Sequence, residues 1–185
     1  NSSAVIQSVF PEADILGIDF SADMVKRAKK DYPDITFEQW DADDFTGKTG
    51  KKFDLIFSNA CLQWLPDQFK TIKNLYKLLN ENGVMAIQIP CNFDEPIHHL
   101  IHKVVTGEKW KTFFKHQRNY VMRSVEEYFD VISSLSDEFD IWTTTYHHVL
   151  PSHEALWVWY EGTGLRPYIS QIDDSMREEF KKDIM

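Results

Sequence analysis

The chain has 185 residues, of which 43% are hydrophobic, enough for one domain of ordinary size. Twenty Lys and Arg against 29 Asp and Glu leave a formal net charge of -9. This balance argues against a nucleic-acid partner, because binding to phosphate backbones needs clustered basic side chains. With charged residues interspersed among apolar ones and only seven Gly and seven Pro, the composition excludes a collagen-like or low-complexity chain.

The two cysteines bear on the cellular compartment. Cys61 and Cys91 lie where we expect buried strand ends, so they provide neither a disulfide framework nor a four-thiolate zinc site. No apolar run reaches the roughly 18 to 20 residues that span a bilayer, and the N-terminus lacks a signal-peptide pattern. We therefore expect a cytoplasmic protein with no membrane partner.

Strands alternate with helices through the first half of the chain. A helix through residues 2–10 ends at Pro11, because proline does not continue a helix. The next apolar patterns predict strands at 15–19, 36–40, 53–58 and 84–89, helices at 22–31 and 69–79, and a turn-rich segment at 43–52. Asn82 and Gly83 are typical of a helix C-terminus. This alternation predicts an α/β fold with a Rossmann-like, doubly wound, mostly parallel sheet.

The second half of the chain is richer in aromatic residues and histidine. We expect helices at 96–105 and 124–135, a long strand at 139–150, and a helix that starts at 151–154 and ends near Gly162. Residues 91–135 are interpreted as a helical cap inserted into a single domain, 1–185. The chain starts and ends within expected helices, so we expect truncation at both ends.

Three strand ends carry the candidate ligand-binding residues. In open parallel sheets, ligands bind outside the carboxyl ends of the strands. Asp19, Asp41 and Asn59 stand there. Asp19 can accept ribose hydroxyls and Asp41 the exocyclic amine of a base, with Phe20 and Met24 packed against that base. Each polar residue also has a plain explanation as a turn residue whose side chain bonds the nearby backbone.

Other patterns favour no ligand. Residues 42–49 resemble a phosphate-binding loop, but a strand is expected after them and not a helix, so we interpret them as a solvated loop. His98 and His102 share a helix face without an evident third ligand, so we expect no metal site. The aromatic residues at 157–160 are interpreted as packing.

Longer motifs resemble a known family. Residues 15–21 (ILGIDFS), Asp41 and residues 53–66 (FDLIFSNACLQWLP) resemble successive motifs of class I S-adenosylmethionine-dependent methyltransferases. The family's glycine-rich loop would then lie before Asn1, and its final hairpin after Met185. The resemblance implies S-adenosyl-L-methionine as cofactor, bound by Asp19 at the ribose, Phe20 and Met24 beside the adenosyl group, Asp41 and Ala42 at the adenine edge, and Asn59 and Ala60 at the methionine side.

A second group of motifs narrows the resemblance. Residues 88–96, 140–146, 151–153 and 163–167 resemble a subfamily that methylates small polycarboxylic acids such as trans-aconitate. The implied reaction is methyl transfer from the sulfonium to a carboxylate oxygen, which gives a monomethyl ester. A carboxylate is already ionised at pH 7, so we expect no catalytic acid or base, only residues that position the reactants.

The acceptor's remaining carboxylates need cationic or hydrogen-bonding partners. Gln63 and Trp64 directly follow the third strand end, and the expected far wall of the pocket carries Tyr146, His147, His153 and Arg166. Because side chains alternate along a strand, only one of His147 and His148 would face the pocket.

Two other functions remain open, and we favour a monomer in each case. The acceptor could be another carboxylic acid or an acyl-carrier thioester, or the chain could be a non-catalytic nucleoside-binding or interaction domain. A dehydrogenase is disfavoured because the third strand end offers no evident acid or base for hydride transfer.

Overall fold

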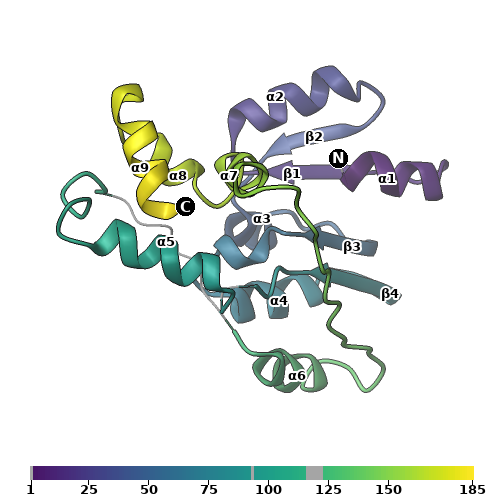
Figure 1. Ribbon diagram of the computed structural model, residues 1–185. Coiled ribbons are helices and arrows are strands. Elements are labelled where there is room, and N and C mark those ends of the chain that lie inside the picture. The colour runs from purple at the N-terminus through teal and green to yellow at the C-terminus, as the bar shows by residue number, and fades with distance from the viewer. Residues whose placement is uncertain (1, 93, 116–122) are drawn as a thin grey trace. The chain divides into compact units, whose positions relative to one another are not determined.

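The structure is a computed structural model that describes residues 2–92, 94–115 and 123–185 (Figure 1). The described residues of 1–89 and 123–139 form one compact unit, and those of 90–122 and 140–185 form another. The expected cap at 91–135 is therefore divided between the two units, and its residues 93 and 116–122 lie outside the described ranges. A single domain with one insertion stays a prediction.

The first unit has α/β structure with parallel strands. The strands form two parallel pairs, β1 with β2 and β3 with β4, in which Asp19 lies opposite Gln39 and Asn59 opposite Gln88. Helix α2 packs on β1 and β2, and α4 packs on β4 (Figure 1). A doubly wound sheet stays a prediction. The elements are α1 (Ser2–Val9), β1 (Leu16–Asp19), α2 (Ala22–Asp31), β2 (Thr36–Gln39), α3 (Ala42–Lys48), β3 (Phe53–Asn59), the 3-10 helix η1 (Leu62–Trp64), α4 (Gln68–Tyr76), β4 (Leu79–Gln88) and α6 (Val125–Ser133).

Contacts between α3 and α4 join the two strand pairs. The hydroxyl of Thr71, which is fully buried, donates to a carboxylate oxygen of Asp43 in the first turn of α3. The ring of Phe45 lies 5.8 Å from that of Trp40, beyond β2, and 6.2 Å from that of Phe53 in β3. Polar and aromatic contacts therefore hold the carboxyl end of β2 beside the β3 and β4 pair.

Three apolar clusters stabilise the chain. Val25, Ile35 and Phe37 join α2 to β2. Leu62, Ile72 and Leu75 join η1 and α4 to β3, β4 and α6. Burying each of these aliphatic or aromatic side chains contributes about 1.5 to 3 kcal/mol, so packing of this kind is the main stabilising contribution. The third cluster belongs to the second unit.

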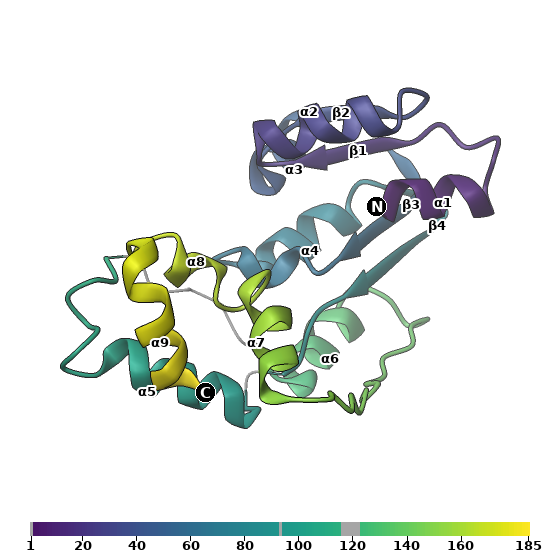
Figure 2. The same ribbon diagram turned by 45° about the horizontal axis from the view of Figure 1, so that its top comes forward.

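The second unit is helical and aromatic. The rings of Trp110, Phe114 and Phe180 contact one another, and the indole Nε1–H of Trp110 donates to Asp183 at 2.7 Å. Helices α5 and α9 lie side by side (Figure 2), and this cluster packs them against each other. The elements are α5 (Pro96–Thr106), α7 (His153–Glu161), α8 (Arg166–Ile169), the 3-10 helix η2 (Asp174–Met176) and α9 (Arg177–Ile184).

The prediction of a turn-rich segment at 43–52 is wrong. Residues 42–48 form helix α3, so the interpretation of 42–49 as a solvated loop is also wrong. Asp41 starts the helix by accepting a hydrogen bond from the backbone N–H of Asp43 at 2.9 Å, and Phe45 is buried on its inner face. A cap and one buried ring are enough for a helix of two turns despite Gly47.

The expected helix stop at Asn82 and Gly83 is also wrong. Helix α4 ends at Tyr76, and β4 begins at Leu79, before this dipeptide. Asn82 adopts a left-handed φ of 61° at an irregularity in the β3–β4 register. At Gly83 a Cβ atom would lie only 3.0 Å from the carbonyl oxygens of Asn80 and Phe53. The dipeptide therefore allows a local bend within a strand. This bend needs a left-handed residue, as a helix C-terminus does, which is why the two are alike in sequence.

The long strand predicted at 139–150 is absent. Residues 141–150 have no regular secondary structure, and most of their side chains are exposed. The alternating pattern fits a strand, but within the described residues no neighbouring strand pairs with it. A strand without a neighbour has no hydrogen-bond partners for its backbone groups, so pattern alone does not form one.

Replacing Thr71 by Val tests the link between α3 and α4. The substitution keeps the side-chain volume and removes the hydroxyl that donates a hydrogen bond to Asp43. The free energy of unfolding should therefore fall by about 1 to 3 kcal/mol. Urea denaturation measures this change. Thr163→Val is the matched control, because the Thr163 hydroxyl is exposed and bonds within one helical segment, to Trp159 O. The control should change stability by no more than about 0.5 kcal/mol. Equal losses in both variants would contradict the link.

Candidate functional site

Asp19 ends β1 and is exposed to solvent. One of its carboxylate oxygens, Oδ1, accepts a hydrogen bond from the backbone N–H of Ser21 at 2.8 Å. The explanation of Asp19 as a turn residue is therefore correct, but it accounts for only one oxygen. The second oxygen remains available to a ligand that donates hydroxyl groups.

Asp41 lies at the end of β2 and repeats this arrangement. Its Oδ1 accepts from the N–H of Asp43 and caps α3, while Ala42 is half-buried in the first turn of that helix. Asp41 stands two residues beyond Gln39, the register partner of Asp19. Two exposed carboxylates therefore lie at neighbouring strand ends, and each uses one oxygen to organise the start of the following helix.

Phe20 and Met24 supply an apolar surface beside Asp19. Their exposed fractions are 74% and 53%, which is high for large apolar side chains. The backbone of Phe20 is held by Gln39, whose side-chain amide donates to the Phe20 carbonyl at 3.0 Å. Sequence analysis missed Gln39, although counting the β1–β2 register would have placed it beside Asp19. A planar heterocycle could cover this surface while its polar edges meet the two carboxylates.

The end of β3 contains a fixed left-handed turn. Asn59 is the last residue of the strand and is exposed, and the next residue, Ala60, has a φ of 51°. The N–H of Ala60 donates to Gln88 O at 2.9 Å, and its carbonyl accepts from Gln63 Nε2 at 2.8 Å. Hydrogen bonds on both sides thus hold an uncommon conformation for a residue that is not glycine.

Gln63 and Trp64 follow in η1 with opposite exposure. Gln63 is only 3% exposed, and its Oε1 atom has no hydrogen-bond partner among the residues that the structure describes. Trp64 is 49% exposed. The predicted contact of Gln63 with a substrate stays a prediction, while its bond to Ala60 is part of the structure.

The Cys61 thiol, just beyond β3, is affected by the Asp19 carboxylate at the end of β1. The residue is exposed, which corrects the expectation of buried cysteines at 61 and 91. Surrounding protein atoms nevertheless desolvate its thiol and raise its pKa, and the Asp19 carboxylate raises the pKa further. An electrostatic effect of Asp19 on Cys61 requires that the two strand ends be neighbours.

Four predicted substrate residues lie in the second unit. Tyr146 and His147 are exposed in the irregular segment, so the argument that alternation along a strand selects one of His147 and His148 no longer applies. His153 is the first residue of α7 and Arg166 the first of α8, and both are exposed. His148, which sequence analysis did not select, contacts the rings of Tyr146 at 6.3 Å and Trp159 at 4.6 Å between centroids. Whether these residues line a pocket stays a prediction.

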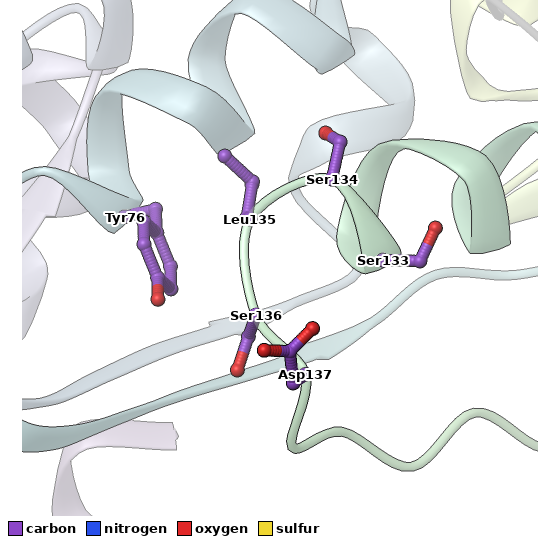
Figure 3. Close-up of a pocket in the computed structure, with 6 residues that line it drawn as sticks. All are labelled: Tyr76, Ser133, Ser134, Leu135, Ser136 and Asp137. Carbon is purple, nitrogen blue, oxygen red and sulfur yellow. The ribbon is translucent and has the colours of Figure 1, made fainter.

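A surface hollow of about 370 Å³ lies elsewhere on the first unit (Figure 3). It is lined by Tyr76 and residues 133–137, and three of these are serines. The serine hydroxyls donate to the backbone carbonyls of Asp130, Val131 and Glu138. The first two bonds satisfy carbonyls at the C-terminal end of α6, and the third lies in the loop that follows, so the hydroxyls are used for local structure and the hollow offers no evident chemistry.

The described residues offer neither a metal-binding cluster nor a membrane-spanning helix. Within residues 2–92, 94–115 and 123–185, no group of three or more His, Cys, Asp or Glu side chains could hold a metal ion. Over the same ranges, no helix has both the length and the apolar character needed to cross a bilayer.

Comparison with known proteins identifies the family. A family model described as a methyltransferase domain matches residues 2–127, about two thirds of the chain, so the chain belongs to the methyltransferase family. Its curated relatives include trans-aconitate 2-methyltransferases of Escherichia coli O9:H4 strain HS and strain K12 DH10B. Both are 39% identical over 182 residues, which are 98% of this chain and 70% of each relative. That of E. coli O7:K1 strain IAI39 is 38% identical over 180 residues, or 97% of this chain and 69% of the relative.

The chain is thus an S-adenosylmethionine-dependent methyltransferase that resembles trans-aconitate 2-methyltransferase. The residues at the strand ends fit a cofactor of this kind. They combine two carboxylates that each keep an available oxygen, an exposed apolar surface, and a left-handed turn near a buried acceptor, Gln63 Oε1, that has no partner among the described residues.

The pKa of Cys61 provides a test of this geometry that does not require a ligand. In a Cys91→Ser background, the pH dependence of Cys61 alkylation by iodoacetamide reports the thiol pKa, which should lie above that of an unhindered cysteine. Asp19→Asn removes the negative charge that raises this pKa, so the alkylation curve should move to lower pH. Asp23→Asn, on the first turn of α2, is the charge-matched control and should leave the curve in place. An unchanged alkylation curve in Asp19→Asn would contradict the prediction that the Asp19 carboxylate lies near the Cys61 thiol.

Proposed function

We propose that the chain binds S-adenosyl-L-methionine at the ends of β1, β2 and β3 and methylates one carboxylate of trans-aconitate. The observation that carries the cofactor site is the pair of acids Asp19 and Asp41, each with one oxygen committed to a helix start and one available. The proposal for the acceptor rests on the 39% identity to enzymes named for trans-aconitate. Another carboxylic acid is the main competing acceptor.

Each residue has a distinct proposed contact. The available oxygen of Asp19 accepts the ribose hydroxyls, and that of Asp41 accepts the adenine amine, with the N–H of Ala42 at the adenine edge. Phe20 and Met24 pack on the adenosyl group, which would cover apolar surface now exposed to water. Asn59 and Ala60 line the methionine side.

In the proposed mechanism the protein positions the two reactants and transfers no proton. The bound cofactor supplies an electrophilic methyl group on a sulfonium. The acceptor carboxylate is ionised at pH 7, so no side chain has to remove a proton from it. Holding the two reactants in line can supply on the order of 7 to 11 kcal/mol of the barrier. The chain's contribution is therefore alignment and removal of water from the nucleophilic oxygen.

The other carboxylates of the acceptor need neutralising partners. Arg166 can form a bidentate pair with a carboxylate. The side chains of Tyr146, His147, His153, Gln63 and Trp64 can donate hydrogen bonds, and we propose all six residues as contacts of the acceptor. The net charge of -9 makes such local donors necessary, because the overall field of the chain repels a polycarboxylate.

The remaining expectations are parts of the same proposal. The two parallel strand pairs support a Rossmann-like, doubly wound sheet. The two free cysteines are consistent with a reducing cytoplasm, and we propose a monomer that acts on a small molecule without nucleic acid.

Calorimetric titration with S-adenosylhomocysteine tests cofactor and acceptor together. The full-length protein encoded by the gene should bind the product cofactor. If trans-aconitate binds next to the cofactor at the same time, it should tighten that binding. Succinate serves as a control acid without the geometry of the double bond. Absence of binding would remove the cofactor site, and equal effects of the two acids would remove the specific acceptor.

Replacing Asp19 by Ala tests the ribose contact. Loss of a charge-assisted hydrogen bond should weaken S-adenosylhomocysteine binding by about 1 to 3 kcal/mol. Asp34→Ala, in the exposed turn before β2, removes the same charge away from the strand ends and should leave the affinity unchanged. Unchanged affinity in Asp19→Ala would exclude Asp19 from the site.

A further inference from the structure

Ala60 needs support to keep its conformation. A φ of 51° lies in the left-handed region, where the Cβ atom of an L-residue crowds its own backbone. Glycine adopts this conformation without that crowding, but the chain has alanine at this position. Surrounding contacts must therefore hold the turn that follows β3.

Two hydrogen bonds provide this support. Gln88, the β4 residue opposite Asn59, accepts from the N–H of Ala60 at 2.9 Å. The side-chain amide of Gln63 donates to the carbonyl of Ala60 at 2.8 Å. The first bond continues the β3–β4 ladder, while the second comes from a side chain and closes the turn from the η1 side.

Gln63 is unusual as a core residue. Its side chain is 3% exposed, and within the described part of the chain Oε1 has no hydrogen-bond partner although Nε2 has one. A buried amide that leaves its acceptor unsatisfied is a poor choice for packing alone, since an apolar side chain of the same size would avoid that desolvation penalty. The donor of Gln63 therefore has a use that packing does not explain.

We propose that Gln63 is a positioning residue that holds the left-handed turn at Ala60 and so shapes the methionine side of the cofactor site. This inference rests on the proposed cofactor site. It differs from the predicted role of Gln63 as a contact for the acceptor. Its effect reaches the cofactor through the backbone of Asn59 and Ala60, so it acts on cofactor affinity more than on acceptor affinity.

Replacing Gln63 by Met removes the donor and keeps the length of the side chain. Titration with S-adenosylhomocysteine should show affinity about tenfold to a hundredfold weaker than in the wild type, while the KM for trans-aconitate at saturating cofactor stays within about twofold. Loss of acceptor affinity with normal cofactor affinity would overturn the proposal and favour direct contact with the acceptor.

Ala60→Gly provides a rescue that a purely structural role would not give. Glycine lowers the cost of the left-handed conformation, so Gln63→Met should weaken cofactor binding less in the Ala60→Gly background than in the wild type. Gln171→Met is the matched control. The Gln171 amide donates to the carbonyl of Pro167 at 2.7 Å in the other unit, and this variant should bind cofactor normally. Additive effects of the Ala60 and Gln63 substitutions would overturn the proposal.

Gln63→Glu keeps the test informative if Gln63→Met does not fold. A protonated carboxyl group can donate to the Ala60 carbonyl and an ionised one cannot. As pH falls, the cofactor affinity of this variant should therefore rise relative to that of the wild type. The same pH dependence of affinity in the variant and the wild type would overturn the proposal. The wild-type titration separates the two levels of inference: no binding there rejects the cofactor site itself, whereas normal binding by wild type and Gln63 variants rejects only the role of Gln63.

Discussion

The hydrogen bond from Thr71 to Asp43 connects the two halves of the candidate site. Each strand pair has its own apolar cluster, so packing alone would leave the ends of β1 and β2 weakly fixed to the end of β3. The buried hydroxyl on α4 and the carboxylate in the first turn of α3 fix this relation, together with the rings around Phe45. Since Asp41 caps α3, the position of that acid depends on the same bond.

The ends of β1 and β2 have the same local hydrogen-bond arrangement. In both β1 and β2 the chain leaves the strand through an aspartate that accepts the backbone N–H two residues later. Asp41 caps α3 directly, whereas Asp19 holds Ser21, whose hydroxyl then caps α2 by accepting from the N–H of Met24. At β3 the solution differs, because a left-handed alanine held by Gln63 and Gln88 replaces the acid. The first two ends therefore present charge, and the third presents shaped backbone.

Local signals in the sequence predicted the elements that have local causes. Helix α2 begins at its Ser21 cap and ends at Asp31 as expected, and α7 begins after its Ser152 cap. The errors occurred where a partner distant in sequence decides the structure. Phe45 makes α3 a helix by packing on β3, and residues 141–150 lack the neighbour that their pattern requires. In the candidate site, the acids could be read from their places after strands, whereas the roles of Gln39 and Gln63 depend on register and folded contacts.

The double use of Asp19 and Asp41 affects how related sequences are compared. Each carboxylate has a structural task that persists whether or not a ligand is present. A descendant that lost its cofactor could keep both acids, because selection for folding alone would retain them. Their presence in an alignment is therefore weak evidence of activity. Phe20 and Met24, whose exposed side chains do little for folding, are the better markers of a lineage that still binds its ligand.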